Sequence, residues 1–338
     1  VEFVHLYWAG LPASPLWEAS YALVAVLAFV GLNAISTEAS GGAETIVTLV
    51  KVAILAIFVG FGIGAIQAGA FQPLFPADGG AATVLPAMGL TFIAFQGYDL
   101  IATVTEEVEN PRRNIPRAIF LSLAATLLIY LLVVAVAIGA LGPEAVGAAG
   151  ETAIVEAAAS FMPDIGIFGA KLGAILIAFG AVFSTISALN AVIIGASRVA
   201  FAMGRDGQLP QRLGTIHQRY GTPFMAILTS AAVMLVATAL APISVVGNLA
   251  SLFSLLGFIV VNFAVIRLRR ERPDLSRPFA VPFYPVTPIV GILLNALLAL
   301  FIAPQTWLIA AAWLAFGVLV YAGLHRMEVG PTPGGSAR

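Results

Sequence analysis

The sequence predicts an all-α membrane protein with about nine transmembrane helices, and three observations lead to that prediction. Of the 338 residues, 60% are hydrophobic and only 10% are charged, a balance that water-soluble domains do not have. The apolar residues gather in runs long enough for a helix to cross the hydrocarbon core of a bilayer. Basic residues fall almost entirely on alternate loops between these runs, which is the pattern of a multi-pass protein.

Each apolar run is expected to form one helix, because about 20 residues at about 1.5 Å each span the hydrocarbon core. The third run is interrupted by polar residues near its middle. The fifth is too long to be embedded throughout, so its polar end is expected to project from the membrane. In chain order the runs cover roughly 19–36, 45–66, 86–106, 118–142, 167–200, 224–241, 247–267, 285–302 and 306–324.

The basic residues also predict the orientation of the chain. Fourteen of the 16 lysine and arginine residues lie at alternate loops or the C-terminus, and only Lys51 and Lys171 do not. The positive-inside rule puts those loops in the cytoplasm, which makes 325–338 a cytoplasmic tail and 1–18 an extracellular loop. The chain starts at Val1 without a signal peptide, so we expect it to begin partway through a longer protein.

Composition excludes several other classes of function. The absence of cysteine removes disulfides, thiolate metal sites and thiol nucleophiles, and three scattered histidines offer no metal-ligand spacing. A net charge of −1 indicates no nucleic-acid partner. Phosphate-binding loops and hydrolase or metalloprotease motifs are missing as well. We therefore expect neither an enzyme nor a bound metal or cofactor.

The most informative segment is FIAFQGYDLIATVTEEVENPRRNIPR at 92–117, where an apolar span is interrupted at 96–99. A break at membrane depth frees peptide groups that only a cavity or a ligand can satisfy. Carbonyls ending the first half-helix favour an ammonium group, and amides starting the second favour an anion. The segment therefore suits a zwitterion. Alternatively, Gly97 is a kink that only improves packing.

Asp99 is the only carboxylate well inside a span, a position that costs a few kcal/mol. It is interpreted as a gating, proton-coupling or substrate-orienting group. It could also be the N-cap of the half-helix that follows Gly97, and the two interpretations are compatible.

A second candidate group combines Lys51 on the second span with Ser184, Thr185 and Ser187 on the fifth. A buried lysine that gains and loses a proton can act where other transporters use a bound sodium ion, and facing hydroxyls can complete a proton site. The alternatives are that Lys51 snorkels to the cytoplasmic face and that the hydroxyls make ordinary interhelical hydrogen bonds.

Charged residues at the inner end of the third span form a third candidate group. Glu106 and Glu107 precede Arg112 and Arg113. They are interpreted either as a cytoplasmic ion-pair latch or as a solvated helix end.

Three segments resemble the amino acid–polyamine–organocation (APC) permeases. They are FIAFQGYDLIATVTEEVENPRRNIPRAI, ASRVAFAMGRDGQLPQRLGTIHQRYGTP and RPDLSRPFAVPFYPVTPIVGI. The resemblance implies a LeuT-like fold with a 5 + 5 inverted repeat and two added helices. It assigns 19–66 to helices four and five, 86–267 to helices six to ten, and 285–324 to helices eleven and twelve. The first three helices, and with them part of the first repeat, would be missing.

The resemblance also implies roles for particular residues. The coupling lysine falls on Lys51, and the facing hydroxyls fall around Ser184 to Ser187. The polar position after the break falls on Asp99. The substrate-contacting unwound segment falls on Ile93, Ala94, Phe95, Gln96 and Gly97. Gln96 replaces the apolar residue that the family usually has before the glycine.

The expected function is therefore secondary active transport of amino acids across the cell membrane by proton symport. The partners would be an amino acid, a proton and the lipid bilayer, without nucleic acid, and the oligomeric state stays open. An exchanger or a sodium-dependent carrier is the first alternative. A membrane sensor or scaffold that keeps a permease fold is the second.

Overall fold

The structure is a computed structural model, and helices make up almost all of it. Its described residues are 20, 23–24, 26–28, 30–31, 37–72, 75, 80–163, 166–167, 170–277 and 279–328. The expected extracellular loop at 1–18 and the end of the expected cytoplasmic tail at 329–338 lie outside this part. The described residues of the expected 19–36 span are helical.

The chain divides into two compact units, Val1–Thr83 with Gly97–Gly195, and Val84–Gln96 with Ala196–Arg338. The unit boundaries after Thr83 and after Gln96 place residues 84–96, where the third expected span starts, in the second unit. These two units are not the expected inverted repeats and added helices, and that arrangement remains a prediction.

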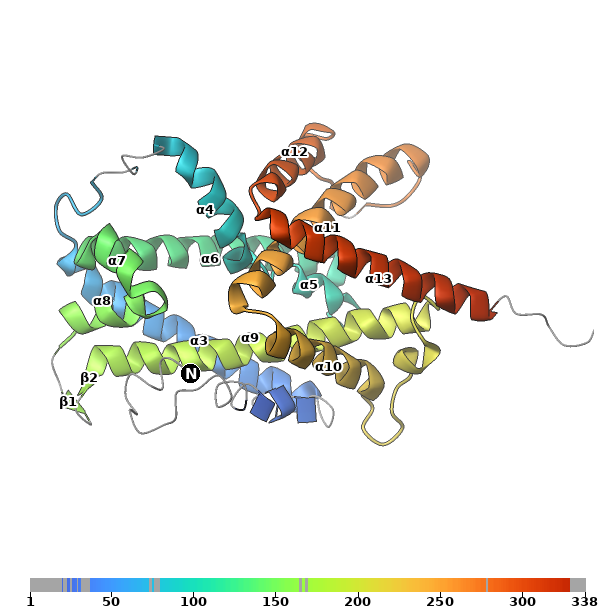
Figure 1. Ribbon diagram of the computed structural model, residues 1–338, viewed down its shortest axis with the longest axis horizontal. Helices are drawn as coiled ribbons and strands as arrows, with labels where there is room; N and C mark the ends of the chain where they lie inside the picture. The colour runs from blue at the N-terminus through green and yellow to red at the C-terminus, as the bar shows by residue number, and fades with distance from the viewer. Residues whose placement is uncertain are drawn as a thin grey trace, which may run out of the picture. The chain divides into compact units, whose positions relative to one another are not determined.

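The first unit holds most of the helices from the first half of the chain (Figure 1). Its elements are α3 (Thr37–Gly62), η1 (Ile63–Ala65), η2 (Gly80–Thr83), α5 (Leu100–Thr103), η4 (Thr105–Glu107), α6 (Pro111–Leu141), α7 (Pro143–Ala149), η5 (Gly150–Thr152), α8 (Ala153–Phe161), the strands β1 (Gly166–Ile167) and β2 (Ala170–Lys171), and most of α9 (Leu172–Arg205). The two strands form a short antiparallel hairpin.

The second unit holds the first half of the broken span and the C-terminal helices. Its elements are α4 (Val84–Thr91), η3 (Phe92–Phe95), the end of α9, η6 (Gln211–Gly214), α10 (Phe224–Leu240), α11 (Ile243–Glu271), α12 (Val286–Leu300) and α13 (Pro304–Glu328).

Five helices of the described part are long and apolar enough to cross a membrane, by length and composition. Two shorter apolar helices accompany them, Phe224–Ala239 and Val286–Leu300. The long ones are Thr45–Ala65, Pro111–Leu141, Leu172–Arg205, Ser244–Glu271 and Pro304–Gly323. These helices confirm the expected all-α, multi-pass membrane fold.

Some boundaries differ from the expected ones for local reasons. The helix expected from 118 begins at Pro111, because proline suits the first helical turn and Asn110 precedes it in the left-handed conformation. The fifth expected span starts at Leu172 rather than 167, since the β hairpin occupies its first residues. The short helices α7 and α8 fill a stretch in which no helix was expected.

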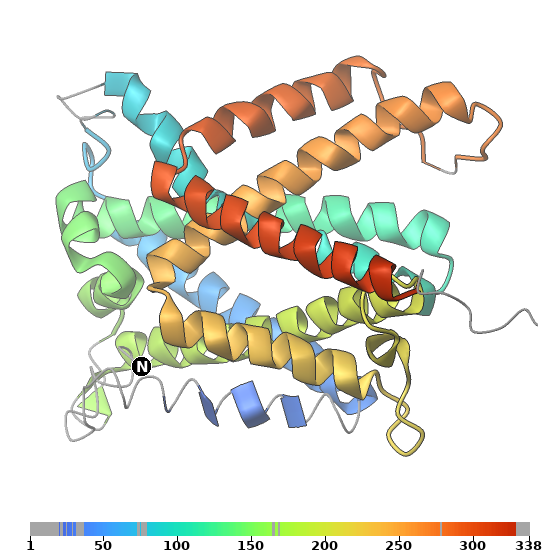
Figure 2. The same cartoon turned by 45° about the vertical axis from the view of Figure 1, so that its right-hand side comes forward.

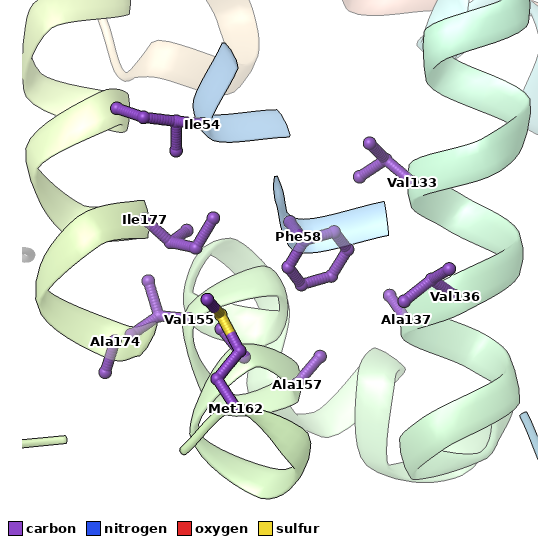
Figure 3. Close-up of a cluster of buried hydrophobic side chains, with 11 residues drawn as sticks. Ile54, Phe58, Val133, Val136, Ala137, Val155, Ala157, Met162, Ala174 and Ile177 are labelled. Carbon is purple, nitrogen blue, oxygen red and sulfur yellow. The ribbon is translucent and has the colours of Figure 1, made fainter. Parts of the chain in front are cut away.

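Phe58 is the centre of the core of the first unit. Its side chain is 0% exposed, and its ring centroid lies 5.2 Å from that of Phe161. Val133 and Val136 of α6 lie on one side of it, and Ile177 of α9 lies on the other (Figure 3). This cluster holds α3, α6, α8 and α9 together.

In the second unit, α11 packs along α12 and also contacts α13 (Figure 2). Asn262 lies against Gly291, whereas the cluster around Leu252 and Leu255 includes Ala299 and Ile302. Because residue numbers rise on α11 as they fall on α12, the two helices are antiparallel. The partly buried Phe92 packs against the same cluster, which anchors the broken span to α11.

Phe58→Ala is expected to lower the free energy of unfolding by about 3–5 kcal/mol, because it removes a buried ring and leaves a cavity. The measurement is the thermal unfolding midpoint of the purified protein in detergent. Phe61→Ala is the matched control on the same helix, since Phe61 is 52% exposed. Equal shifts for the two variants would contradict the assigned core.

Candidate functional site

The third expected span is broken where the sequence predicts. The α-helix α4 ends at Thr91 and continues as the 3-10 helix η3 to Phe95. Gln96 is then extended, with φ −71° and ψ 155°, and Gly97 has φ +116°. Asp99 is again in the right-handed helical region, and the helix α5 begins at Leu100. The interruption therefore covers 96–99.

Gly97 is required here by its backbone conformation and not by crowding. A Cβ atom added to it would meet nothing within 4 Å. Its φ lies in a region that L-residues with a side chain rarely adopt, and that glycine enters without steric penalty. The break thus depends on a residue type that the sequence supplies locally.

The turn leaves some backbone groups without a partner. Gln96 N–H donates to the Ile93 carbonyl over 3.1 Å, and Leu100 N–H donates to the Gly97 carbonyl over 3.1 Å. Within the described part of the chain, the Gln96 carbonyl accepts no hydrogen bond and the Asp99 N–H donates none. One free acceptor and one free donor therefore flank Gly97, which is the arrangement expected of a zwitterion site.

Asp99 occupies the N-cap position of α5, but its side chain makes no capping hydrogen bond. Instead, Asp99 Oδ1 accepts a hydrogen bond from the Gly97 N–H over 3.0 Å. Asp99 therefore has the position of an N-cap without its side-chain hydrogen bond, because the carboxylate turns back over the break rather than toward the helix. Asp99 is also exposed, so the charge remains accessible to a cation.

The other residues of the unwound segment differ in exposure. Ile93 is 41% exposed, Ala94 is exposed, and Phe95 is partly buried. The Nε2 atom of Gln96 is buried and has no hydrogen-bond partner in the described part of the chain. The Oγ atom of Ser251 on α11, which no sequence motif marks, is likewise buried without a hydrogen-bond partner in the described part of the chain. A hydroxyl within an apolar span was the only sequence signal for it.

The structure brings Lys51 together with one of the three expected hydroxyls. Lys51 Nζ donates a hydrogen bond to Ser187 Oγ over 2.8 Å, although 136 residues separate them. Ser187 is only 4% exposed, and Lys51 is half-buried. Nearby, Ile54 packs closely against Gly180. The glycine lets α3 approach α9, and this approach places the ammonium against the hydroxyl.

The other two hydroxyls do not reach the lysine in this structure. Ser184 and Thr185 are exposed, and Thr185 Oγ1 donates to the Ala181 carbonyl of its own helix over 3.0 Å. Asn190, which is 3% exposed, lies one turn from Ser187 on the same face of α9. Ser187 is thus the hydroxyl of α9 that meets α3, through Lys51.

The expected ion-pair latch is not formed among the described side chains. Arg112 and Arg113 are both exposed, and neither forms an ion pair there. Glu106 is exposed too, while the side chain of Glu107 lies outside the described ones. The latch therefore remains a prediction. The described residues also contain no group of three metal-ligating side chains.

Apolar helices long enough to span a bilayer, together with a span broken at a glycine, define a multi-pass membrane protein of the transporter type. The family comparison agrees with this class. The model of the amino acid permease family matches residues 7–323, and the chain belongs to this family of the APC superfamily. The family consists of permeases rather than enzymes.

Curated relatives carry transport names. The chain is 29% identical over 302 residues to the methylthioribose transporter of Bacillus subtilis, covering 89% of this chain and 63% of the relative. It is 28% identical over 300 residues to the branched-chain amino acid permease BcaP of the same organism, covering 89% and 62%. The serine/threonine exchanger SteT of Bacillus subtilis is 27% identical over 275 residues, covering 80% and 60%. The chain spans less than two thirds of the length of these three relatives.

Gly97→Ala is expected to destabilise the protein by about 1–3 kcal/mol, because alanine must adopt a strained φ. The measurement is the thermal unfolding midpoint in detergent. Gly60→Ala is the matched control, since Gly60 is helical, also has open space around its Cβ position, and gains helix propensity. A Gly97→Ala variant as stable as Gly60→Ala would show that the break does not need glycine.

Proposed function

We propose that the complete gene product transports amino acids across the cell membrane by secondary active transport coupled to protons. The observation that carries this proposal is the unwound backbone beside Asp99 in an otherwise apolar span. Membership of the amino acid permease family supports the substrate class. In the described part of the chain, the Gln96 carbonyl and the Asp99 N–H have no other hydrogen-bond partner, which supports a ligand there.

The proposed substrate site uses main-chain groups for the charged ends of the amino acid. The free carbonyl of Gln96 and the carboxylate of Asp99 suit the ammonium group. The free N–H of Asp99, just before the second half-helix, suits the carboxylate. Ile93, Ala94, Phe95 and Gly97 complete the segment that would contact the substrate.

The proposed proton site is centred on Lys51. Lys51 Nζ donates to Ser187 Oγ, and in the proposed mechanism the loss of a proton from the lysine would remove a charge from the contact between α3 and α9. Proton binding can therefore bias the packing of these two helices. Ser184 and Thr185 are proposed as further hydroxyls of this site in another conformation.

The proposed orientation follows from the basic loops. The C-terminus and the loop that contains Arg112 and Arg113 would face the cytoplasm. There, the two arginines would pair with Glu106 and Glu107 when the transporter closes on that side.

Exchange is a second candidate, because one relative is named a serine/threonine exchanger. Transport that needs an amino acid on the opposite side of the membrane would favour it over symport. A sodium gradient that drives uptake would favour a sodium-dependent carrier. Ligand binding without flux would instead favour a sensor or scaffold.

Uptake of labelled amino acids into proteoliposomes is expected to rise with an inward proton gradient. In Lys51→Ala, the gradient should lose its effect, a change of about tenfold, because coupling of two ligands typically changes affinity 5- to 150-fold. Lys171→Ala is the matched control, since Lys171 is exposed and its Nζ donates to the Ala159 carbonyl. Unchanged pH dependence in Lys51→Ala would remove this lysine from the mechanism.

Asp99→Asn is expected to raise the KM for a zwitterionic amino acid about fivefold, because a neutral amide binds an ammonium less strongly than a carboxylate does. Asn can still accept the hydrogen bond from Gly97, so the thermal midpoint should stay near that of the wild type. Asp99→Ala removes both the charge and the acceptor, and it should raise the KM and lower the thermal midpoint. A KM that the Asn variant leaves unchanged would show that the charge plays no part in binding.

A further inference from the structure

Two polar atoms in the second unit are buried and lack a hydrogen-bond partner among the described residues. They are Gln96 Nε2 and Ser251 Oγ, and Ser251 is only 1% exposed. Buried polar groups are almost always hydrogen-bonded, and leaving one unpaired is unfavourable. A pair of such atoms therefore calls for a partner that binds there.

The two residues come from elements that pack against each other. Ile93 Cδ1 lies 3.6 Å from the Cβ position of Gly247 on α11. The rings of Phe92 and Phe258 meet edge to face, with centroids 6.2 Å apart. The 3-10 helix η3 thus lies alongside α11 between Gly247 and Phe258, and Ser251 falls between these two contacts.

The helical register puts Ser251 on the face of α11 that meets η3. At about 100° per residue, Gly247, Ser251 and Phe258 lie within about 40° of one another around the helix axis. In a 3-10 helix, residues three apart lie on one face. Gln96 is the residue directly after η3, and its N–H donates to the carbonyl of Ile93, the residue that contacts Gly247. Both unpaired atoms therefore belong to segments of one unit that pack against each other.

We propose that Gln96 and Ser251 form a hydrogen-bonding site for the side chain of the transported amino acid. The inference rests on the proposed function. The substrate class it selects is a neutral amino acid with a side-chain oxygen, such as serine or threonine, over a branched aliphatic one. Gln96 also contributes its main-chain carbonyl to the zwitterion site, so the substrate side chain lies within reach of the same residue.

The chemistry of the two atoms sets this preference. Nε2 only donates, and the serine hydroxyl both donates and accepts. A substrate hydroxyl can accept from Nε2 and donate to Ser251 Oγ. An aliphatic side chain would leave both protein atoms unpaired, and sites that hydrogen-bond a substrate group reject analogues without that group. Relatives named for branched-chain amino acids and for serine and threonine both occur, so family membership leaves this choice open.

The test measures serine and leucine uptake side by side in proteoliposomes that contain the complete gene product. The wild type should prefer serine. Gln96→Leu and Ser251→Ala should each lower the ratio of serine to leucine uptake about tenfold, within the range of hydrogen-bond selectivity. The double variant should lose little more than either single variant, since both residues act on one substrate group.

Two matched controls remove hydroxyls that already have partners. The first is Thr91→Val, at the residue immediately before η3, where Thr91 Oγ1 donates to the Ala87 carbonyl. Thr238→Val lies on α10, and Thr238 Oγ1 donates to the Met234 carbonyl. Both should keep the wild-type ratio.

A stability measurement separates the substrate site from a structural one. Replacing an unpaired buried polar atom removes no hydrogen bond, so neither Gln96→Leu nor Ser251→Ala should lower the thermal midpoint without substrate. Lower midpoints with an unchanged uptake ratio would mean an internal water or protein partner and would overturn the inference. A wild type that prefers leucine would also overturn it while leaving amino acid transport intact. Absence of uptake of every amino acid would instead refute the proposed function.

Discussion

The constraint on which this structure depends is that a peptide group in hydrocarbon must find a hydrogen-bond partner within the protein or a ligand. A continuous helix satisfies this constraint with its own backbone hydrogen bonds, whereas the interrupted span that contains Gly97 does not. Its positive φ turns the chain out of the helix, and Asp99 satisfies the amide of Gly97 from two residues away. The Gln96 carbonyl is left for something outside the chain segment. The break therefore has the properties of a binding site.

The contact between α3 and α9 shows a different use of the same constraint. Lys51 is a charged group on an apolar helix, and Ser187 supplies it with a buried acceptor. Close packing makes this contact possible, since Gly180 leaves room for Ile54. The core around Phe58 then fixes the distance between the helices. A change in the charge of the lysine would act directly on this packing, which is the property that a coupling site needs.

Polar groups that have a hydrogen-bond partner within the protein support its structure, whereas buried polar groups without one are candidates for a function. Hydroxyls such as Thr91 and Thr238 bond to their own helices, as is common where no other partner is near. Gln96 and Ser251 do not, although their atoms are buried. A folded protein can keep an unpaired buried polar group, despite its unfavourable free energy, when that group has a function such as binding a ligand. Main-chain groups would bind the charged ends shared by all amino acids, and these two side chains would distinguish between substrates.

The sequence by itself determined the apolar spans, the position of the break and the family. Each of these depends on residues close together in the chain, such as the glycine at position 97 and the long motifs around it. The tertiary structure decided that Asp99 turns backward instead of capping α5. It also decided that Ser187 rather than Ser184 meets Lys51, and that η3 packs against α11. These outcomes depend on the rotation and spacing of helices far apart in the sequence, and packing sets both.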